Sequence, residues 1–241
     1  MQQNLIFALH GFLGEAKDWE KIQSEMAETQ IIEWIVPDLF SSKSLNVTDY
    51  EAYVDRLIKE NKLELPTSKK KIFIGYSLGG RLGLYLLKKY SKLFDAFVFV
   101  STHPGLVFTQ EKDERVKSDL AWSDVIKTQA WSAFMKLWNS QPIFNNSDVD
   151  PIREEKLFDA DKLSAAMRFW SLGLQEDMQK IIQINQSKII WVVGSEDSKF
   201  LTLADELKQK KILLDYSKIF SSHRILNNNP KALVKILQQL F

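Results

Sequence analysis

The chain has 241 residues, of which 45% are hydrophobic and 26% charged, and its formal net charge is +1. These values are ordinary for one globular enzyme domain or a core domain with a lid, and they show no nucleic-acid footprint. The absence of cysteine excludes disulfides, thiolate metal sites and a cysteine nucleophile. No stretch approaches the ~20 apolar residues that span a bilayer. We therefore expect a soluble, cytoplasmic protein with no nucleic-acid partner and no membrane insertion.

The N-terminal part of the chain alternates between two apolar patterns. Continuous apolar runs predict buried strands at Leu5–Leu9, Ile31–Val36, Ile72–Ile74 and Ala96–Val100. Apolar residues at helical spacing lie between them, at Trp19, Ile22 and Met26 and again from Tyr50 to Ile58. Thr48 and Glu51 predict a capping box at the start of the second helix. Strand–helix alternation of this kind predicts an α/β fold with a mostly parallel sheet flanked by helices.

The alternation stops between residues 104 and 187, where helices are predicted at Glu111–Lys127, Ala130–Asn139 and Asp161–Leu174. We interpret 104–187 as a helical lid inserted between strands of a core formed by 1–103 and 188–241. The lid carries an aromatic stripe, which we expect to be lid core rather than the lining of a ligand pocket: Trp131, Phe134 and Trp138.

Beyond the lid the strand and helix signals return. A strand is predicted at Lys188–Val193, a helix at Leu201–Lys208 and a last strand near Ile212–Leu214. Asn229 as a cap and Pro230 at the first helical position predict the final helix.

The motif Gly75-Tyr76-Ser77-Leu78-Gly79 lies between a predicted strand and a predicted helix. G-x-S-x-G in this setting is typical of a nucleophile elbow, in which a sharp turn presents the serine at the top of the sheet. Glycines two residues before and after the serine are needed because this turn is crowded. Ser77 is therefore the candidate nucleophile.

A serine nucleophile needs a base and a group that orients the base. Asp197 directly follows a strong strand and His223 comes later, which is the serine–acid–histidine order of α/β-hydrolases. Glu196 and Asp205 are nearby alternatives for the acid. The other two histidines, His10 and His103, lie in loops after earlier predicted strands.

The backbone N–H groups of Phe12 and Leu78 are the candidate oxyanion hole. Scattered histidines and the absence of an H-E-x-x-H motif give no metal site, and no dinucleotide or phosphate-loop glycine pattern occurs. We expect no cofactor.

Arg81 lies one helical turn after Ser77 in an otherwise apolar helix, so its charge needs a partner. That partner is either a structural carboxylate or an anionic substrate, since guanidinium groups suit carboxylates.

Several patches together resemble the family of 2-succinyl-6-hydroxy-2,4-cyclohexadiene-1-carboxylate (SHCHC) synthases of menaquinone biosynthesis, members of the α/β-hydrolase superfamily. The resemblance rests on the elbow with its arginine and on four further segments: His10–Gly14, His103–Leu106, Trp138 with Gln141–Phe144, and Gly194–Phe200. It spans nearly the whole chain, lid included.

The resemblance implies an α/β-hydrolase fold and a lyase that eliminates pyruvate from an enolpyruvyl cyclohexene carboxylate, with a Ser-His-Asp triad as base. The small substrate carries several carboxylates. The resemblance assigns substrate binding to Tyr76, Arg81, Arg115 and Trp138. It also implies a second lid arginine, for which Arg153 and Arg168 are both candidates; Arg168 is the one assigned to the site.

Two other functions remain open. The first is a carboxylic-ester or thioester hydrolase that acts through an acyl-serine intermediate. The second is a catalytically inactive member of the fold that serves as a receptor or scaffold, against which the complete set of Ser77, Asp197 and His223 argues.

Overall fold

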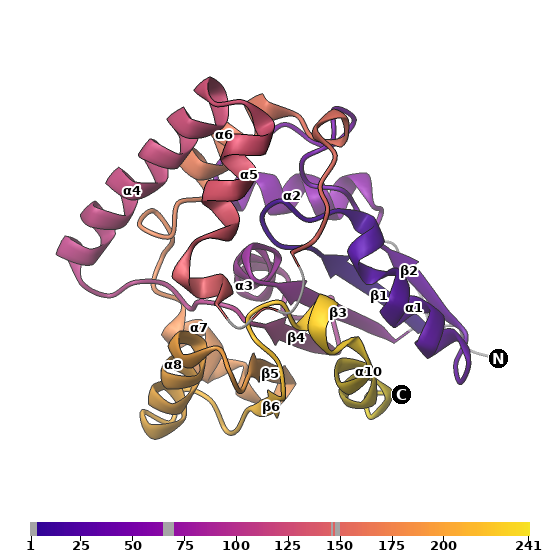
Figure 1. The fold of residues 1–241 in the computed structure, drawn as a ribbon. Coiled ribbons are helices and arrows are strands. Elements are labelled where there is room, and N and C mark those ends of the chain that lie inside the picture. Colours follow the sequence, from indigo (N-terminus) through magenta and orange to yellow (C-terminus); the bar gives the residue numbers. More distant parts are fainter. Residues whose placement is uncertain (1–3, 65–69, 146, 148–149) are drawn as a thin grey trace.

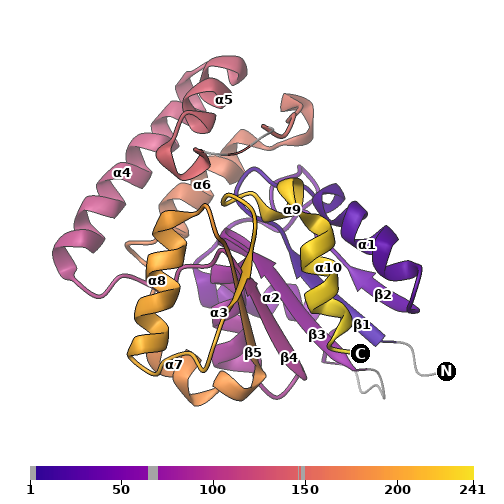
Figure 2. The ribbon, with the colours of Figure 1, turned by 60° about the horizontal axis from the view of Figure 1, so that its bottom comes forward.

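The computed structural model describes residues 4–64, 70–145, 147 and 150–241. Its core is a six-stranded sheet in the order β2-β1-β3-β4-β5-β6, with parallel pairing throughout the described residues. Figures 1 and 2 show this sheet with helices on both faces. The predicted fold class is confirmed. The strands are β1 (Asn4–Leu9), β2 (Ile32–Ile35), β3 (Lys71–Tyr76), β4 (Ala96–Val100), β5 (Ile189–Gly194) and β6 (Ser217–Ile219).

The central strands are apolar throughout because both faces of the sheet are covered. In β1, Leu5, Phe7 and Leu9 pack into the cluster that includes apolar residues of α2 (Tyr50–Glu60), α3 (Leu78–Tyr90) and α8 (Ser198–Gln209). Ile6 and Ala8 pack into the opposite cluster, with residues of α1 (Glu20–Ala27) and α10 (Pro230–Gln238). Alternation with a period of two thus divides one apolar run between two cores.

Three predictions about secondary structure differ from what the structure shows. The run Ile212–Leu214 is not a strand: Ile212 and Leu213 are buried beside the end of α8, and the N–H of Ile212 donates to the Leu207 carbonyl at 2.9 Å. The last strand is instead β6, in which Ile219 is the buried residue. Helix α2 is capped by the Asp49 side chain, which accepts from the Ala52 N–H, and not by a box at Thr48. The predicted helix Asp161–Leu174 ends earlier, at Phe169.

The helices between β4 and β5 lie mainly over the carboxyl ends of the strands (Figure 1). They are α4 (Thr109–Thr128), α5 (Trp131–Asn139), α6 (Ala160–Phe169) and α7 (Gln179–Ile184), and α4 packs against α6. Helix α7 packs against α3 of the core. The division into a core and a lid over 104–187 remains a prediction. The shorter helices are η1 (Ala16–Trp19), η2 (Pro142–Phe144), η3 (Glu155–Leu157), η4 (Gln186–Lys188) and α9 (Ile225–Asn228).

The turn from β3 into α3 is tight because α3 lies almost against β1. A Cβ atom on Gly79 would lie 2.2 Å from the Leu9 carbonyl oxygen, and one on Gly75 would lie 2.6 Å from the Gly79 oxygen. Both distances are far below van der Waals contact with backbone atoms, which cannot rotate away. Glycine at these two positions is therefore what allows α3 to start where it does.

We expect Gly79→Ala to lower the free energy of unfolding by about 3 kcal/mol or to prevent folding, because the added methyl overpacks a rigid backbone contact. Thermal and urea unfolding measure this, with Lys235→Ala on the exposed face of α10 as a control expected to match the parent chain. A Gly79→Ala protein of unchanged stability would show that α3 can move away from β1.

Candidate active site

Ser77 connects the end of β3 to the start of α3 and has backbone angles of φ 52° and ψ −111°. A positive φ is unfavourable for a residue other than glycine, and it persists where the surrounding structure imposes it. The Ser77 N–H donates to the Val100 carbonyl of the adjacent strand at 2.8 Å, and its own carbonyl accepts from the Arg81 N–H. The side chain is thereby presented at the helix N-terminus, above the carboxyl edge of the sheet.

Two loops that follow neighbouring strands carry the other candidate catalytic groups. Asp197 follows β5 and His223 follows β6. Backbone hydrogen bonds tie the loops together: Ser195 N–H donates to the Ile219 carbonyl at 2.8 Å, and Glu196 N–H donates to the Ser221 carbonyl at 3.0 Å. Because these backbone hydrogen bonds join the two loops, the positions of Asp197 and His223 are coupled.

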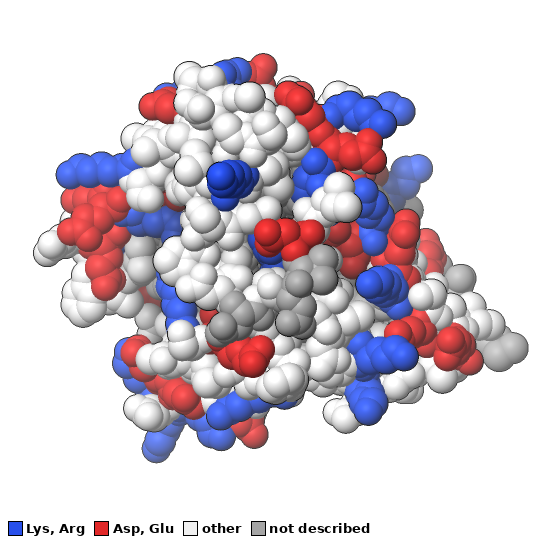
Figure 3. Space-filling view, viewed as in Figure 1, with Lys and Arg blue, Asp and Glu red and all other residues white. Residues whose placement is uncertain are grey.

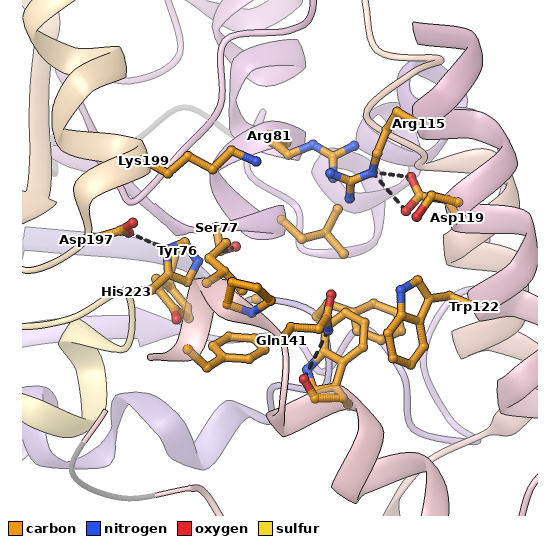
Figure 4. Close-up of a pocket in the computed structure, with 18 of the residues that line it drawn as sticks. Tyr76, Ser77, Arg81, Arg115, Asp119, Trp122, Gln141, Asp197, Lys199 and His223 are labelled. Carbon is orange, nitrogen blue, oxygen red and sulfur yellow. Dashed lines mark hydrogen bonds and ion pairs between the residues drawn. The ribbon is translucent and has the colours of Figure 1, made fainter. Parts of the chain in front are cut away.

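The three side chains form a continuous chain of contacts (Figure 4). His223 Nδ1 lies 2.6 Å from Asp197 Oδ2, and His223 Nε2 lies 3.2 Å from Ser77 Oγ. An ionised carboxylate only accepts, so Nδ1–H donates to Asp197 and Nε2 is left to accept the Ser77 hydroxyl proton. Asp197 is held in turn by the Phe200 N–H, which donates to Oδ1 at 3.4 Å. This arrangement can make Ser77 a base or a nucleophile.

Aromatic rings surround the imidazole of His223. Tyr76, Phe144 and Phe200 have ring centroids 5.7, 6.2 and 4.8 Å from it. Burial raises the pKa of Tyr76, so its hydroxyl stays a neutral phenol. The low-polarity surroundings strengthen the hydrogen bond between His223 and Asp197.

Phe12 and Leu78 both line the cavity in front of Ser77, and the backbone N–H of neither donates a hydrogen bond within the described part of the chain. His10 shapes the loop that carries Phe12: its Nδ1–H donates to the Gly11 carbonyl at 2.8 Å, and its Nε2 accepts from the Leu39 N–H at 3.0 Å. Burial lowers the pKa of His10, in agreement with a neutral ring that both donates and accepts.

His103 lies outside the cavity lining, and its Nδ1 accepts from the Gly105 N–H at 3.1 Å. Burial, together with nearby Lys199, lowers its pKa to about 3, so His103 is neutral and adds no charge to the site.

A cavity of about 620 Å³ opens in front of Ser77. Of the residues predicted for the site, it is lined by Phe12, Tyr76, Ser77, Leu78, Arg81, Arg115, Trp138, Asp197 and His223. The predicted aromatic stripe divides: Trp138 lines the cavity, whereas Phe134 is buried within the lid and Trp131 stacks on Phe158. The expectation that the whole stripe is lid core was therefore wrong for Trp138.

Cationic side chains lie along one side of this cavity. Figure 4 shows Lys199, Arg81 and Arg115 on that side, with Trp122 and Gln141 opposite and Ser77 beside His223. On the molecular face in Figure 3, by contrast, basic and acidic side chains are interspersed. The gathering of cations is thus a property of the cavity rather than of that surface.

The two arginines of the cavity have different partners. Arg115 Nε donates to both carboxylate oxygens of Asp119, at 2.9 and 2.8 Å. Arg81 makes no ion pair with a carboxylate among the described residues; it donates to Gln175, to the Tyr50 hydroxyl and to the Trp170 carbonyl. The structural carboxylate considered for Arg81 is therefore not found within the described chain.

Neither candidate for the second lid arginine lies in this cavity. Arg168 is exposed, because the buried face of α6 is formed by Leu163, Ala166 and Met167 and points the other way. The assignment of Arg168 to the cavity was wrong, and the helical period of α6 could have shown this. Arg153 is 6% exposed and is paired with Asp18 at 2.7 Å and with Glu15 at 3.1 Å, so it fastens the lid region to the core.

Lys199 is the cation that sequence reasoning missed. It lines the cavity from the start of α8, two residues after Asp197, and donates to no described residue. Burial, followed by the nearby charge of Arg115, lowers its pKa below the ordinary lysine value. Its position in the Asp-Ser-Lys-Phe segment was the available signal.

Two absences are limited to the described residues. No group of His, Asp and Glu there could hold a metal ion. No helix there is both long and apolar enough to cross a membrane.

A serine on a strand–helix elbow of a parallel sheet, with an acid and a histidine after later strands, defines the class of α/β-hydrolase-like proteins. A family model described as alpha/beta hydrolase fold matches residues 4–128, so the chain belongs to that family.

Relatives and solved structures extend the likeness to the whole chain. The chain is 26% identical over 240 residues to 2-succinyl-6-hydroxy-2,4-cyclohexadiene-1-carboxylate synthase of Escherichia coli O17:K52:H18, covering 98% of this chain and 92% of the relative. The synthase of Shigella sonnei is also 26% identical, with the same coverage. MenH from S. aureus superposes with a TM-score of 0.83 at 19% identity, covering 99% of this chain and 93% of that one. An esterase from Thermogutta terrifontis with malate bound gives a TM-score of 0.73 at 16% identity, covering 99% and 89%. The solved structures show the fold alone.

We expect Asp197→Asn to slow the reaction of Ser77 with a fluorophosphonate probe by about 10⁴-fold, because an amide at this position favours the wrong imidazole tautomer. Probe labelling followed by mass spectrometry measures the rate. The control is Asp205→Asn, at the alternative acid, which bonds the Tyr216 hydroxyl instead and should label at the parent rate. Equal loss in both variants would remove Asp197 from the assigned role.

Proposed function

We propose that this chain is an SHCHC synthase, a lyase that eliminates pyruvate from an enolpyruvyl cyclohexene carboxylate in menaquinone biosynthesis. The observation that carries the proposal is the cationic side of the cavity in front of Ser77, formed by Arg81, Arg115 and Lys199. It is supported by relatives of that name, which the chain matches over 98% of its length, lid region included. The cytoplasmic location expected from the sequence remains a prediction.

In the proposed reaction Ser77 acts as a base and not as a nucleophile. Its Oγ takes a proton from a ring carbon while its own proton passes to His223 Nε2, 3.2 Å away. Asp197, 2.6 Å from His223 Nδ1, stabilises the imidazolium that forms. The electrons of the broken C–H bond form a new C=C bond, and the C–O bond to the enolpyruvyl group breaks.

Charge that develops on the substrate during proton removal is assigned to the N–H groups of Phe12 and Leu78. Both residues line the cavity, and Leu78 begins α3, where the helix dipole also favours negative charge. The leaving enolate takes up the proton and departs as pyruvate, which returns His223 to its neutral form.

Binding is assigned to the two sides of the cavity. Arg81, Arg115 and Lys199 would hold carboxylates of the substrate, since guanidinium and ammonium groups form strong charge-assisted hydrogen bonds with them. Trp138 would contact its apolar ring from the lid, and Tyr76 would contact it from beside Ser77. The rings of Phe12 and Trp138 contact each other in a tilted arrangement with centroids 4.7 Å apart, so the aromatic side has little freedom to collapse into the cavity.

A carboxylic-ester or thioester hydrolase is the less favoured alternative. The same serine, histidine and acid would serve it, and esterases share the fold. An ester bond carries no charge, however, and it gives no reason for three cations along the cavity that contains the nucleophile. The cations favour a substrate with more than one carboxylate.

Ser77→Ala should lower the rate of pyruvate release by about 10³-fold or more, because the base is lost. Arg81→Ala should raise KM about thirtyfold or more by removing a partly buried partner of a carboxylate. A coupled lactate dehydrogenase assay measures both. Arg168→Ala is the control for loss of a lid-region cation and should behave as the parent, since this arginine is exposed. An unaffected rate in Ser77→Ala would refute the mechanism.

Lys199 should give the reaction an alkaline limit. Its ammonium attracts the substrate while protonated, so kcat/KM is intact below the Lys199 pKa and falls as pH rises through it. Because that pKa is lowered, the fall comes before the range of an ordinary lysine. In Lys199→Arg the charge persists, and the decline should disappear from a kcat/KM profile between pH 7 and 11. A decline of the same shape in Lys199→Arg would assign it to another group.

A further inference from the structure

The guanidinium of Arg81 is held entirely by neutral groups. Nε donates to Gln175 Oε1 at 2.7 Å, while Nη2 donates to the Tyr50 hydroxyl and to the Trp170 carbonyl. These bonds use three of the five N–H donors of an arginine. The two hydrogens of Nη1 donate to no described residue, and Arg81 lines the cavity.

The groups that hold Arg81 are themselves fixed in orientation. Gln175 is 1% exposed, and its Nε2 donates to the His103 carbonyl at 3.0 Å. Since an arginine only donates and a carbonyl only accepts, the amide oxygen of Gln175 must face Arg81. Tyr50 is 4% exposed, its hydroxyl donates to the Trp170 carbonyl at 2.8 Å, and its ring stacks on Tyr85 with centroids 4.5 Å apart. Burial raises the pKa of Tyr50, which keeps it neutral.

Arg115 lies on the same side of the cavity but bonds a carboxylate rather than neutral groups. The buried carboxylate of Asp119 accepts from its Nε through both oxygens. Arg115 and Arg81 are both partly buried. An arginine drawn away from water is normally compensated by an acid in this manner, because an unpaired charge there is costly. At Arg81 a glutamine and a tyrosine stand where that acid would be expected.

We propose that Gln175 and Tyr50 are positioning residues that hold Arg81 with neutral hydrogen bonds only, so that no carboxylate of the protein is bonded to it and its guanidinium is left for a carboxylate of the substrate. This rests on the proposed function, in that the substrate is anionic. Nη1 presents its two hydrogens to the cavity, and the side chain does not reorient when the ligand arrives. The entering carboxylate becomes the counter-ion of a cation that is already oriented and largely removed from water.

The proposal separates charge from shape at position 175. Gln175→Glu keeps the size of the side chain and places a carboxylate against Arg81, whose positive neighbourhood holds it ionised. Gln175→Met removes both side-chain hydrogen bonds and adds no charge. Gln175→Glu also loses the hydrogen bond to the His103 carbonyl, so structural damage alone would weaken the binding of charged and neutral ligands alike. The proposed role instead makes glutamate weaken the binding of a charged ligand and leave that of its neutral counterpart near the parent value.

Isothermal titration with phthalate, a ring that carries two carboxylates, tests this without turnover, and phthalamide is its neutral counterpart. We expect Gln175→Glu to weaken phthalate binding about tenfold or more, and Gln175→Met only about threefold. Phthalamide binding should change less than twofold in either variant. Parent-like phthalate binding by Gln175→Glu, or an equal loss in Gln175→Met, would overturn the proposal.

Tyr50→Phe supplies a second variant should Gln175→Glu fail to fold. It deletes the hydroxyl that accepts from Nη2 and keeps the ring on Tyr85. Phthalate binding should weaken while phthalamide binding and thermal unfolding stay near the parent values; loss of both ligands together would contradict the positioning role.

The positioning of Arg81 by Gln175 and Tyr50, here called the clamp, can be tested separately from the proposed reaction. A parent protein that releases no pyruvate but shows the charge-specific loss in Gln175→Glu would remove the lyase assignment and leave the clamp on Arg81 in place. A parent protein that releases pyruvate, together with phthalate binding that Gln175→Glu does not change, would support the lyase assignment and remove the clamp.

Discussion

The site depends on the contact between the first turn of α3 and the carboxyl end of β1. Gly79 lies so close to the Leu9 carbonyl that a Cβ atom would approach it to 2.2 Å. This contact fixes the start of the helix and leaves Ser77 at a positive φ, because the chain has no other way to pass from β3 into α3. The Leu78 N–H, the Ser77 hydroxyl and Arg81 all take their positions from it. A backbone packing constraint therefore determines where the proposed base, the proposed oxyanion donor and one cation of the cavity lie.

The three cations of the cavity differ in the groups that they bond. Arg115 is paired with Asp119, Arg81 is held by Gln175 and Tyr50, and Lys199 has no described partner. Each arrangement leaves a different share of positive charge for a ligand. Burial is the largest cause that lowers the pKa of Arg81 and of Lys199, and the nearby positive charge of Arg115 lowers both further. Groups that mutually repel when the cavity is empty gain most from an entering anion, so the electrostatics favour a ligand with several carboxylates.

The sequence predicted most of the fold and the turn that carries Ser77, because those features depend on local constraints. Apolar runs marked β1, β3 and β4, and the glycines around Ser77 marked the elbow. The run Ile212–Leu214 was misleading, since burial beside the end of α8 needs apolar residues as a strand does. Arg168 and Lys199 show the other limit. Whether a cation reaches a cavity depends on how its helix is rotated against its neighbours, and the residue type alone does not show this rotation. For α6, however, the buried face could have been derived from the spacing of its apolar residues.

The serine, histidine and acid do not by themselves decide the reaction class. A serine that can lose its proton to His223 can attack a carbonyl or remove a proton from carbon, and both outcomes use the same N–H groups to stabilise an oxyanion. The choice is made by which substrate atom is held in front of Ser77. In the proposed reaction, cations along one side of the cavity would hold the substrate by its carboxylates, while Trp138 and its neighbours would confine the ring. Substrate orientation, set by residues outside the catalytic chain, is thus the physical difference between a lyase and an esterase built on this elbow.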